Sequence, residues 1–161
     1  MRIGLSILCA ALLLSGCAGR PGTATVYKPA NIFGGYKDEM VGPAMWKIEA
    51  RSNGIAERGF ASNMAAYRAA ELAKQAGFSH FEIIDQEGKT TMVGYGAPTN
   101  FAGENLMLLI RGKSDALPPS ECRAKDQTAC FTAAVDEIIR QVEPMLTFPK
   151  GDPRNPVNLE K

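Results

Sequence analysis

The stretch that decides the fold is YRAAELAKQAGFSHFEIID, residues Tyr67–Asp85, because it holds the end of a helix, a helix stop and a strand. The helix is expected over Ser62–Ala76, with Ser62 as its N-cap. Small side chains on one broad face would let this helix lie close to a sheet; they are Ala66, Ala69, Ala70, Ala73 and Ala76. Gly77 then ends the helix, since glycine readily adopts the left-handed conformation found after helix C-termini. Phe81–Asp85 follows as a strand.

The residues before this helix predict another strand. Trp46–Arg51 (WKIEAR) alternates apolar and charged side chains, which is the period of a half-buried strand. Ser52–Gly54 supplies turn residues that end it. A strand, a helix and a second strand in this order can form a right-handed crossover, which makes the two strands parallel.

The next part of the chain predicts further strands in a less regular pattern. Gln86–Lys89 reads as a turn, Thr90–Tyr95 as a return strand and Gly94–Gly103 as a glycine-rich loop. Leu106–Ile110 (LMLLI) is wholly apolar, which is typical of a central strand buried on both faces. Lys113–Lys125 contains two prolines and is expected to be a loop.

The last helix is predicted over Ala129–Leu146, where apolar residues recur at steps of four and three. Its expected core positions are Phe131, Val135, Ile138, Val142 and Met145. The polar face lacks the dense lysines of a membrane-surface helix. The sequence thus predicts a single small α+β domain in β-α-β-β-β-α order, with a mixed sheet of three to four strands and two helices packed on one face.

The start of the chain has the pattern of an export signal. Arg2 precedes the apolar run Ile3–Leu14, whose length suits a signal-peptide hydrophobic region and is short for a membrane span. Leu14–Cys17 (LSGC) then resembles the lipobox of bacterial lipoproteins. That resemblance implies a signal peptide over residues 1–16 and acyl chains, such as palmitate, on Cys17; two or more chains hold a protein stably on a membrane. A secretory signal with a chance cysteine is the alternative.

The residue after the lipobox bears on location. Gram-negative lipoproteins retained in the inner membrane often have an aspartate there, whereas this chain has Ala18. The resemblance implies the cell outer membrane, on its periplasmic face, with the inner membrane as the alternative. Residues 17–30 are expected to form a tether, 31–147 the α+β domain and 148–161 a Pro-rich flexible tail. Within the domain, Asn31–Trp46 is expected to be an ordered surface loop.

Charge and cysteine content narrow the functional classes. The chain has 161 residues, of which 18 are basic and 17 acidic, so it lacks the basic excess of a nucleic-acid-binding protein. Of the four cysteines, Cys9 would leave with the signal peptide and Cys17 would carry lipid, so Cys122 and Cys130 remain. An oxidising periplasm predicts a disulfide between them, with two free thiols as the alternative. We expect no metal or cofactor, because metal binding needs several converging ligands and His80 is the single histidine.

Three stretches are distinctive in combination. They are FGGY at Phe33–Tyr36, GPAMWKIEARSNG at Gly42–Gly54, and YRAAELAKQAGFSHFEIID at Tyr67–Asp85. Together with the lipobox they resemble an uncharacterised family of small Gram-negative bacterial lipoproteins. That family has a GGY segment, a strand ending in Asn-Gly, and an R-A-A-E-L-A helix that leads through glycine to an aromatic strand. The resemblance implies a lipid-anchored envelope protein and brings no activity with it.

A candidate recognition surface follows from aromatic, glycine and charged residues in these motifs. Its members are Phe33, Gly34, Gly35, Tyr36, Trp46, Tyr67, Arg68 and Glu71. Aromatic side chains are common interface anchors, so the surface would bind an envelope protein partner. The alternative is that these residues pack the N-terminal loop onto the sheet, with Arg68 and Glu71 as an ion pair.

Candidates for catalysis are few. His80 would need a free thiol nearby to act in a nucleophilic pair. Asp38 with Glu39, or Glu82 with Asp85, could form an acid/base pair, although solvated carboxylates are commoner. The sequence therefore favours a non-enzymatic binding or structural module of the envelope.

Two alternatives to that function stay open. A small-molecule or glycan-binding module would use the aromatic loop near Tyr36 and Trp46, and would show a concave pocket there. An envelope hydrolase would show converging carboxylates with raised pKa values.

Overall fold

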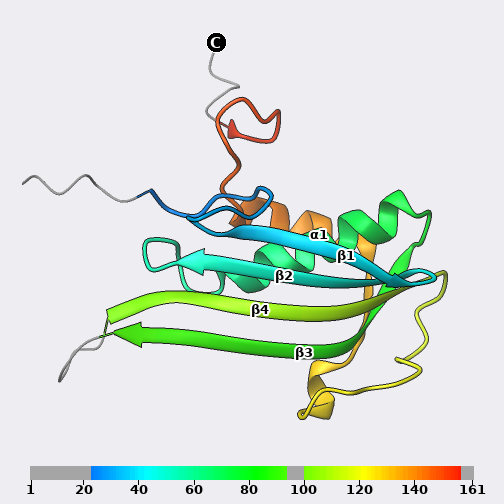
Figure 1. The fold of residues 1–161 in the computed structure, drawn as a ribbon. Coiled ribbons are helices and arrows are strands. Elements are labelled where there is room, and N and C mark those ends of the chain that lie inside the picture. Colours follow the sequence, from blue (N-terminus) through cyan, green and yellow to red (C-terminus); the bar gives the residue numbers. More distant parts are fainter. Residues whose placement is uncertain (1–22, 94–99, 157–161) are drawn as a thin grey trace, which may run out of the picture.

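The described residues form an α+β fold of one five-stranded sheet and two α-helices (Figure 1). The computed structural model describes residues 23–93 and 100–156. In chain order the elements are β1 (Gly35–Gly42), β2 (Met45–Asn53), α1 (Phe60–Gln75), β3 (His80–Val93), β4 (Asn100–Lys113), the 3-10 turn η1 (Gln127–Ala129), β5 (Thr132–Ala134), α2 (Val135–Val142) and the 3-10 turn η2 (Glu143–Met145). The strands lie in the order β1-β2-β4-β3-β5. The α+β class is confirmed, but the sheet has five strands instead of three to four.

The sheet is antiparallel throughout, and the predicted mixed sheet is wrong. Both β2 and β3 pair with β4 in antiparallel register, for example through Ile48 with Leu108 and Ile83 with Ile110. β2 and β3 therefore run in the same direction, as a β-α-β crossover requires, but β4 lies between them. The sequence order alone did not show that a later strand would insert into this gap.

α1 occupies the predicted helical stretch but begins at Phe60, so Ser62 is not its N-cap. The residue before the helix is Gly59, which has the left-handed φ of 84°. Its amide donates to both carboxylate oxygens of Glu104 on β4, each at 2.9 Å. A side chain from the sheet thus satisfies the start of the helix in place of a local cap.

The end of α1 follows the prediction. Gly77 has a left-handed φ of 82°, and the Phe78 amide donates to the Ala73 carbonyl at 2.9 Å. The Phe78 ring lies against β4 at Gly112, where an added Cβ would be 2.3 Å from the ring. Gly112 is therefore needed for a close approach between the helix cap and the sheet.

β1 and β3 differ from the predicted strands. β1 lies within Asn31–Trp46, for which the sequence predicts a loop. The prediction is wrong because glycine and proline residues obscure the period of the strand. β3 runs without a turn through Gln86–Lys89, with Gly88 paired to β4. The expected return strand Thr90–Tyr95 is the continuation of β3, as far as Val93. Residues 94–99 of the expected glycine-rich loop lie outside the described residues.

The C-terminal helix is shorter than predicted. α2 spans only Val135–Val142, because the residues before it form β5 and pair with the start of β3. Phe131 and Met145 were expected in the core, and both are exposed. The apolar residues keep a spacing of four and three on both sides of α2, so the spacing overestimates the length of the helix.

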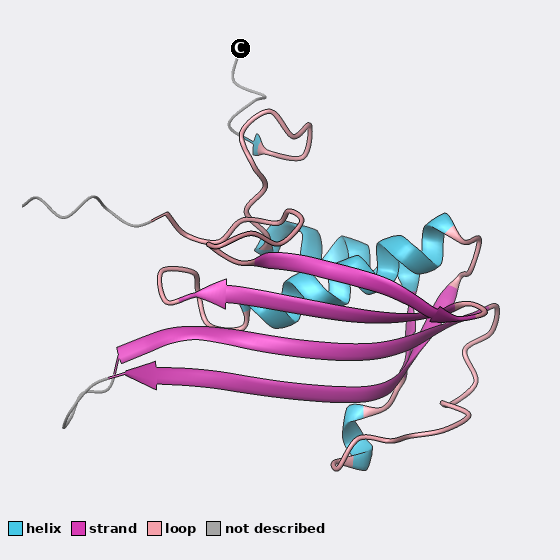
Figure 2. Ribbon diagram, viewed as in Figure 1, coloured by secondary structure: helices cyan, strands magenta, loops and turns pink. Residues whose placement is uncertain are grey.

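The core lies between the helices and one face of the sheet (Figure 2). Fully buried alanines of α1 meet apolar side chains of β2 and β4; they are Ala61, Ala65, Ala69, Ala70 and Ala73. Leu106, Leu108 and Ile110 point into this core. Met107 and Leu109 point to the other face and are partly exposed. β4 is therefore buried on one face, not on both as LMLLI suggested.

The two chain ends pack on the domain more closely than predicted. Tyr27, expected in the tether, is buried, and its amide donates to the Thr147 carbonyl at 2.8 Å. Phe148, expected in the flexible tail, is buried beside Tyr27. Residues 23–30 and 148–156 thus belong to the packed structure, because their aromatic and ionic side chains find partners on α1. The expected signal peptide and Cys17 lie outside the described residues.

Candidate functional site

The motif residues of the sequence meet the chain ends in one group of side chains, which we call the aromatic–ionic cluster. Its members are Tyr27, Tyr36, Asp38, Tyr67, Arg68, Glu71, Glu143, Phe148, Asp152 and Arg154. The cluster joins β1, α1, η2, the segment before β1 and the segment after η2. It therefore ties together parts of the chain that are far apart in sequence.

The aromatic rings of the cluster pack around Tyr27. Its ring centroid lies 4.7 Å from that of Tyr36, 5.1 Å from Tyr67 and 5.6 Å from Phe148. The Arg154 guanidinium lies 4.4 Å from the centroid of the Phe148 ring. These spacings are those of favourable aromatic and cation–π contacts.

Glu71 is the centre of the ionic part. Its carboxylate accepts from the Tyr27 hydroxyl, from Arg68 Nη1 at 3.0 Å and from Arg154 Nη1 at 2.8 Å. Arg68 Nε also donates to Asp38 on β1 at 2.9 Å. The ion pair predicted between Arg68 and Glu71 is therefore present, as part of a larger network.

The pKa values in the cluster follow from burial and pairing. Burial and the hydrogen bond to Glu71 raise the pKa of Tyr27 well above its ordinary range. Burial and the hydrogen bond to Glu143 raise the pKa of Tyr67 to about 12. Hydrogen bonds from Arg154 lower the pKa of Asp152 to about 2. At neutral pH both tyrosines thus remain donors and Asp152 remains charged.

The candidate recognition surface divides between this cluster and other places. Tyr36, Tyr67, Arg68 and Glu71 belong to the cluster and are largely covered by its other members. Trp46 is in the core, 5% exposed, and pairs with Met40 at the far end of β1 from Tyr36.

The remaining members of that surface lie in the turn before β1. Gly34 and Gly35 have φ of 108° and 123°. A Cβ added at Gly34 would lie 2.5 Å from the Arg51 carbonyl, and one added at Gly35 would lie 2.5 Å from the Lys28 carbonyl. Phe33 is 49% exposed. Of the eight predicted residues, only Phe33 therefore presents a large apolar surface to solvent. The packing interpretation accounts for the others, and Tyr36 and Trp46 do not share a pocket.

A second polar group is buried on the face of the sheet that the helices leave open. Glu82 of β3 is 1% exposed. It accepts from Arg111 Nη1 at 2.9 Å, from the Ser120 hydroxyl at 2.8 Å and from the Ser120 amide at 2.9 Å, and Lys113 Nζ lies at 3.5 Å. Burial raises the pKa of Glu82, but the Ser120 hydrogen bonds and the two cations outweigh it, so the net pKa is lowered. Such a carboxylate is a charged structural group, unlike the general acid that a hydrolase would need.

The loop between β4 and β5 covers Glu82 and carries the predicted disulfide. Cys122 and Cys130 are bonded, with Cα atoms 5.7 Å apart. The Arg123 amide donates to the carbonyl of the fully buried Ile84 at 2.8 Å. The disulfide loop therefore packs on β3 at Ile84, where the register of the pairing with β4 shifts between Ile83 and Asp85.

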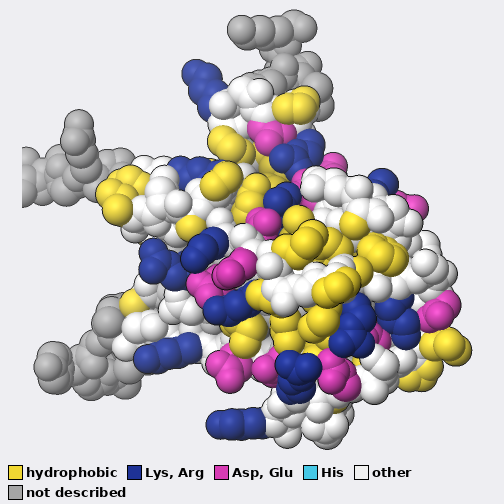
Figure 3. All heavy atoms as spheres, turned by 45° about the vertical axis from the view of Figure 1, so that its right-hand side comes forward, with side chains coloured by type: hydrophobic (Ala, Val, Ile, Leu, Met, Phe, Trp, Pro, Cys, Tyr) yellow, Lys and Arg dark blue, Asp and Glu magenta, His cyan; other side chains and the backbone are white. Residues whose placement is uncertain are grey.

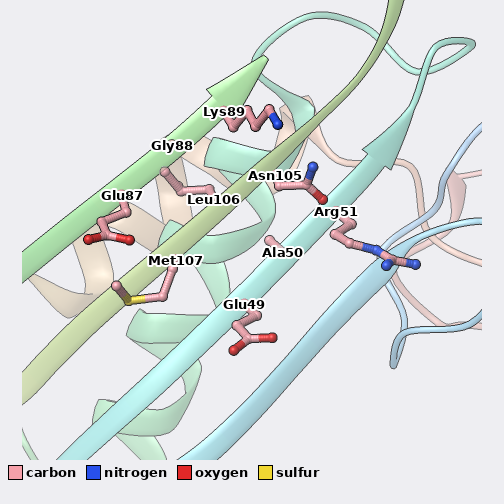
Figure 4. A pocket seen from close by; sticks show the side chains of 9 residues that line it. All are labelled: Glu49, Ala50, Arg51, Glu87, Gly88, Lys89, Asn105, Leu106 and Met107. Atoms are coloured by element: carbon pink, nitrogen blue, oxygen red, sulfur yellow. The ribbon is translucent and has the colours of Figure 1, made fainter. Parts of the chain in front are cut away.

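The rest of this open face forms a shallow hollow across β2, β4 and β3 (Figure 4). The hollow encloses about 290 Å³, and its exposed lining is Glu49, Arg51, Glu87, Lys89, Asn105 and Met107. Charges of both signs lie on this face: Glu49 of β2 pairs across the ladder with Lys37 of β1 on one side and with Met107 of β4 on the other. Basic and acidic side chains are interspersed with hydrophobic ones in the space-filling view (Figure 3).

Sequence reasoning missed this hollow. The alternation in WKIEAR did place Lys47, Glu49 and Arg51 on one face of β2. The wholly apolar LMLLI hid that Met107 would lie beside them. No signal in the sequence marked Glu82 as buried, because its cover comes from a loop distant in the chain.

The described ranges 23–93 and 100–156 contain no group of three or more potential metal ligands, and no helix there is long and apolar enough to cross a membrane. His80 is partly buried and shares a hydrogen bond of 2.9 Å with the Ser79 hydroxyl. Comparison of the chain with protein-family models, with curated proteins and with solved structures finds no match.

Proposed function

We propose that this chain is a lipid-anchored, non-enzymatic protein of the Gram-negative envelope, held on the periplasmic face of the outer membrane, whose open sheet face binds another envelope protein. The membrane part of the proposal is supported by the resemblance of Leu14–Cys17 to a lipobox. The bond between Cys122 and Cys130 suits an oxidising compartment. The described fold begins shortly after Cys17, so an acyl anchor there would hold the domain near the membrane.

The observation that carries the binding role is the open face of the sheet. Met107 and Leu109 of its central strand are partly exposed. Charged side chains of both signs flank them: Glu49 and Glu87 pair with Met107, and Lys47 pairs with Leu109. An apolar centre inside a polar rim is the usual composition of a protein interface.

The aromatic residues that motivated small-molecule or glycan binding are used in packing. Tyr36 lies under Arg68, whose guanidinium is 4.9 Å from the ring centroid. Trp46 is buried under the helices. The open face, not the aromatic loop, is therefore the surface on which we expect a partner.

Labelling with palmitate tests the anchor. Growth of a Gram-negative host that expresses the full chain in labelled palmitate should label the protein, and Cys17→Ala should abolish the label. Cys9→Ala is the matched control, because Cys9 lies inside the expected signal and should leave the labelling unchanged. Equal labelling of the Cys17→Ala variant and the parent chain would contradict the anchor.

Photo-crosslinking in living cells tests the binding face. A photoreactive residue at Met107 should give a discrete protein adduct that mass spectrometry identifies. The same residue at Asp136, which is exposed on α2 behind the sheet, is the control. An adduct from Met107 alone supports the proposal, whereas the same adduct from both positions, or none from Met107, contradicts it.

A further inference from the structure

We propose that one end of the sheet rests on the lipid bilayer, and we call it the entry end because the chain enters the domain there (Figure 1). The entry end is defined by four exposed apolar residues, Ile32, Phe33, Ile55 and Met145. The inference rests on the proposed acylation of Cys17 and adds the surface that meets the membrane.

Contacts of the first described residues locate the entry end. The Thr23 carbonyl accepts from Asn53 Nδ2 at 2.7 Å, at the end of β2. Thr25 Oγ1 accepts from the Asn53 amide at 2.9 Å and donates to the Phe33 carbonyl at 2.7 Å. The Ile55 amide donates to Asn53 Oδ1 at 3.2 Å. The entering chain, the turn before β1 and the turn after β2 thus meet at Asn53.

The apolar side chains of this end are exposed. Ile32 is 87% exposed and Phe33 49%, on a tight turn in which the amides and carbonyls of Asn31 and Gly34 bond to each other. Ile55 and Met145 line one hollow beside Thr25. An apolar turn that projects from a folded domain is suited to the boundary between lipid head groups and acyl chains.

The length of the intervening chain limits how far these side chains can lie from the membrane. Six peptide steps join Cys17 to Thr23, and a fully extended chain of that length spans only about 20 Å. Acyl chains on Cys17 would place that residue at the bilayer surface. The entry end must then lie within the same distance of the bilayer.

The opposite end of the sheet has no such link to the bilayer. It also exposes apolar side chains, namely Met40 and Val41 next to the β1–β2 turn and Phe131 before β5. β4 runs between the two ends with 14 residues, which correspond to about 45 Å of strand. The tether restrains only the entry end. A domain that stands on this end holds the opposite end about 45 Å from the bilayer, so we expect only the entry end to touch it.

A fluorescent probe that is sensitive to its environment tests this orientation in the acylated, full mature chain. With Cys17 acylated and Cys122 bonded to Cys130, Ile32→Cys supplies a free thiol for an NBD label, and Met40→Cys supplies the matched thiol at the opposite end. The protein is reconstituted in vesicles of phosphatidylethanolamine and phosphatidylglycerol, with or without nitroxide-labelled lipid. Flotation of the same vesicles reports the anchor.

We expect the nitroxide lipid to quench about half or more of the emission at position 32 and little at position 40, as for a side chain at the acyl boundary. Equal quenching at both positions in floating vesicles would overturn the orientation while the anchor stands. Failure of the protein to float would overturn the anchor, and the orientation with it.

Discussion

The two faces of the sheet are stabilised by different physical means. On the helix side, Ile48, Leu108 and Ile110 pack against alanines of α1, and the contact depends on shape and apolar volume. On the open side, a charged residue is buried: Glu82 is covered by a loop and neutralised by Arg111 and Lys113. The run of apolar residues in β4 therefore has two roles: one face of the strand packs in the core, and the other lies among charged side chains at the surface.

The largest expected effect separates the two faces at neighbouring residues of β4. Ile110→Ala removes a fully buried side chain under α1 and should lower the free energy of unfolding by about 3–4 kcal/mol. Leu109→Ala is the matched control on the partly exposed side and should cost about 1 kcal/mol. Urea titration of both variants measures the difference. Equal losses would mean that the open face is as well packed as the core.

The next effect concerns the buried carboxylate. Glu82→Ala removes the carboxylate that Arg111 and the Ser120 amide and hydroxyl share under the loop. Although Arg111 keeps Glu121, the loss should cost about 3 kcal/mol. Glu87→Ala, on the same strand and face but exposed, should change stability by less than about 0.5 kcal/mol. Thermal unfolding followed by circular dichroism compares the two. If Glu82→Ala unfolds at the temperature of Glu87→Ala, the ionic group does not stabilise the open face.

Acid titration should sharpen the same contrast. The pKa of Glu82 is lowered in the folded protein, so its stabilising effect is present above the ordinary value of 4.5 and is lost as the pH falls through the lower, folded value. The free energy of unfolding should therefore decrease as the pH falls below 4.5. Glu82→Gln should reduce this slope relative to the parent chain. A parent-like slope in Glu82→Gln would show that other carboxylates cause the loss.

The smallest expected effect tests whether apolar packing alone stabilises the face of the sheet that the helices cover. Tyr27→Phe keeps the ring among Tyr36, Tyr67 and Phe148 but removes the donor to Glu71. We expect a loss of about 1 kcal/mol, since Glu71 keeps both arginine partners. Denaturant unfolding measures it. A loss as large as that of Ile110→Ala would mean that the ionic network, not the aromatic packing, provides most of the stability of this region.

The elements that could be predicted from the sequence are those whose period is undisturbed. WKIEAR and the alanine-rich helix before Gly77 were found because their side chains repeat at the spacing of a half-buried strand and an amphipathic helix. β1 was missed because Gly34, Gly35 and Gly42 interrupt the pattern. β3 was divided in two because Glu87-Gly88-Lys89 has the composition of a turn, although the pairing with β4 continues through it.

The candidate site was predicted only in part, since its members meet through tertiary contacts. Arg68 and Glu71 lie three residues apart on one helix, so their pairing was visible in the sequence. Tyr27 and Arg154 come from segments that composition assigned to a tether and a tail. Nothing local indicates that both side chains bind Glu71.

The contact between the two chain ends has a consequence for the order of events during synthesis. Tyr27 packs on Phe148 and bonds to Thr147, so the first part of the fold is completed by almost the last. Such distant contacts form late in folding, because the chain between them must be ordered first. A nascent chain cannot make these contacts before Thr147 and Phe148 have been synthesised, so Tyr27 and the segment before it stay without them until then, which leaves time for enzymes to act on that segment.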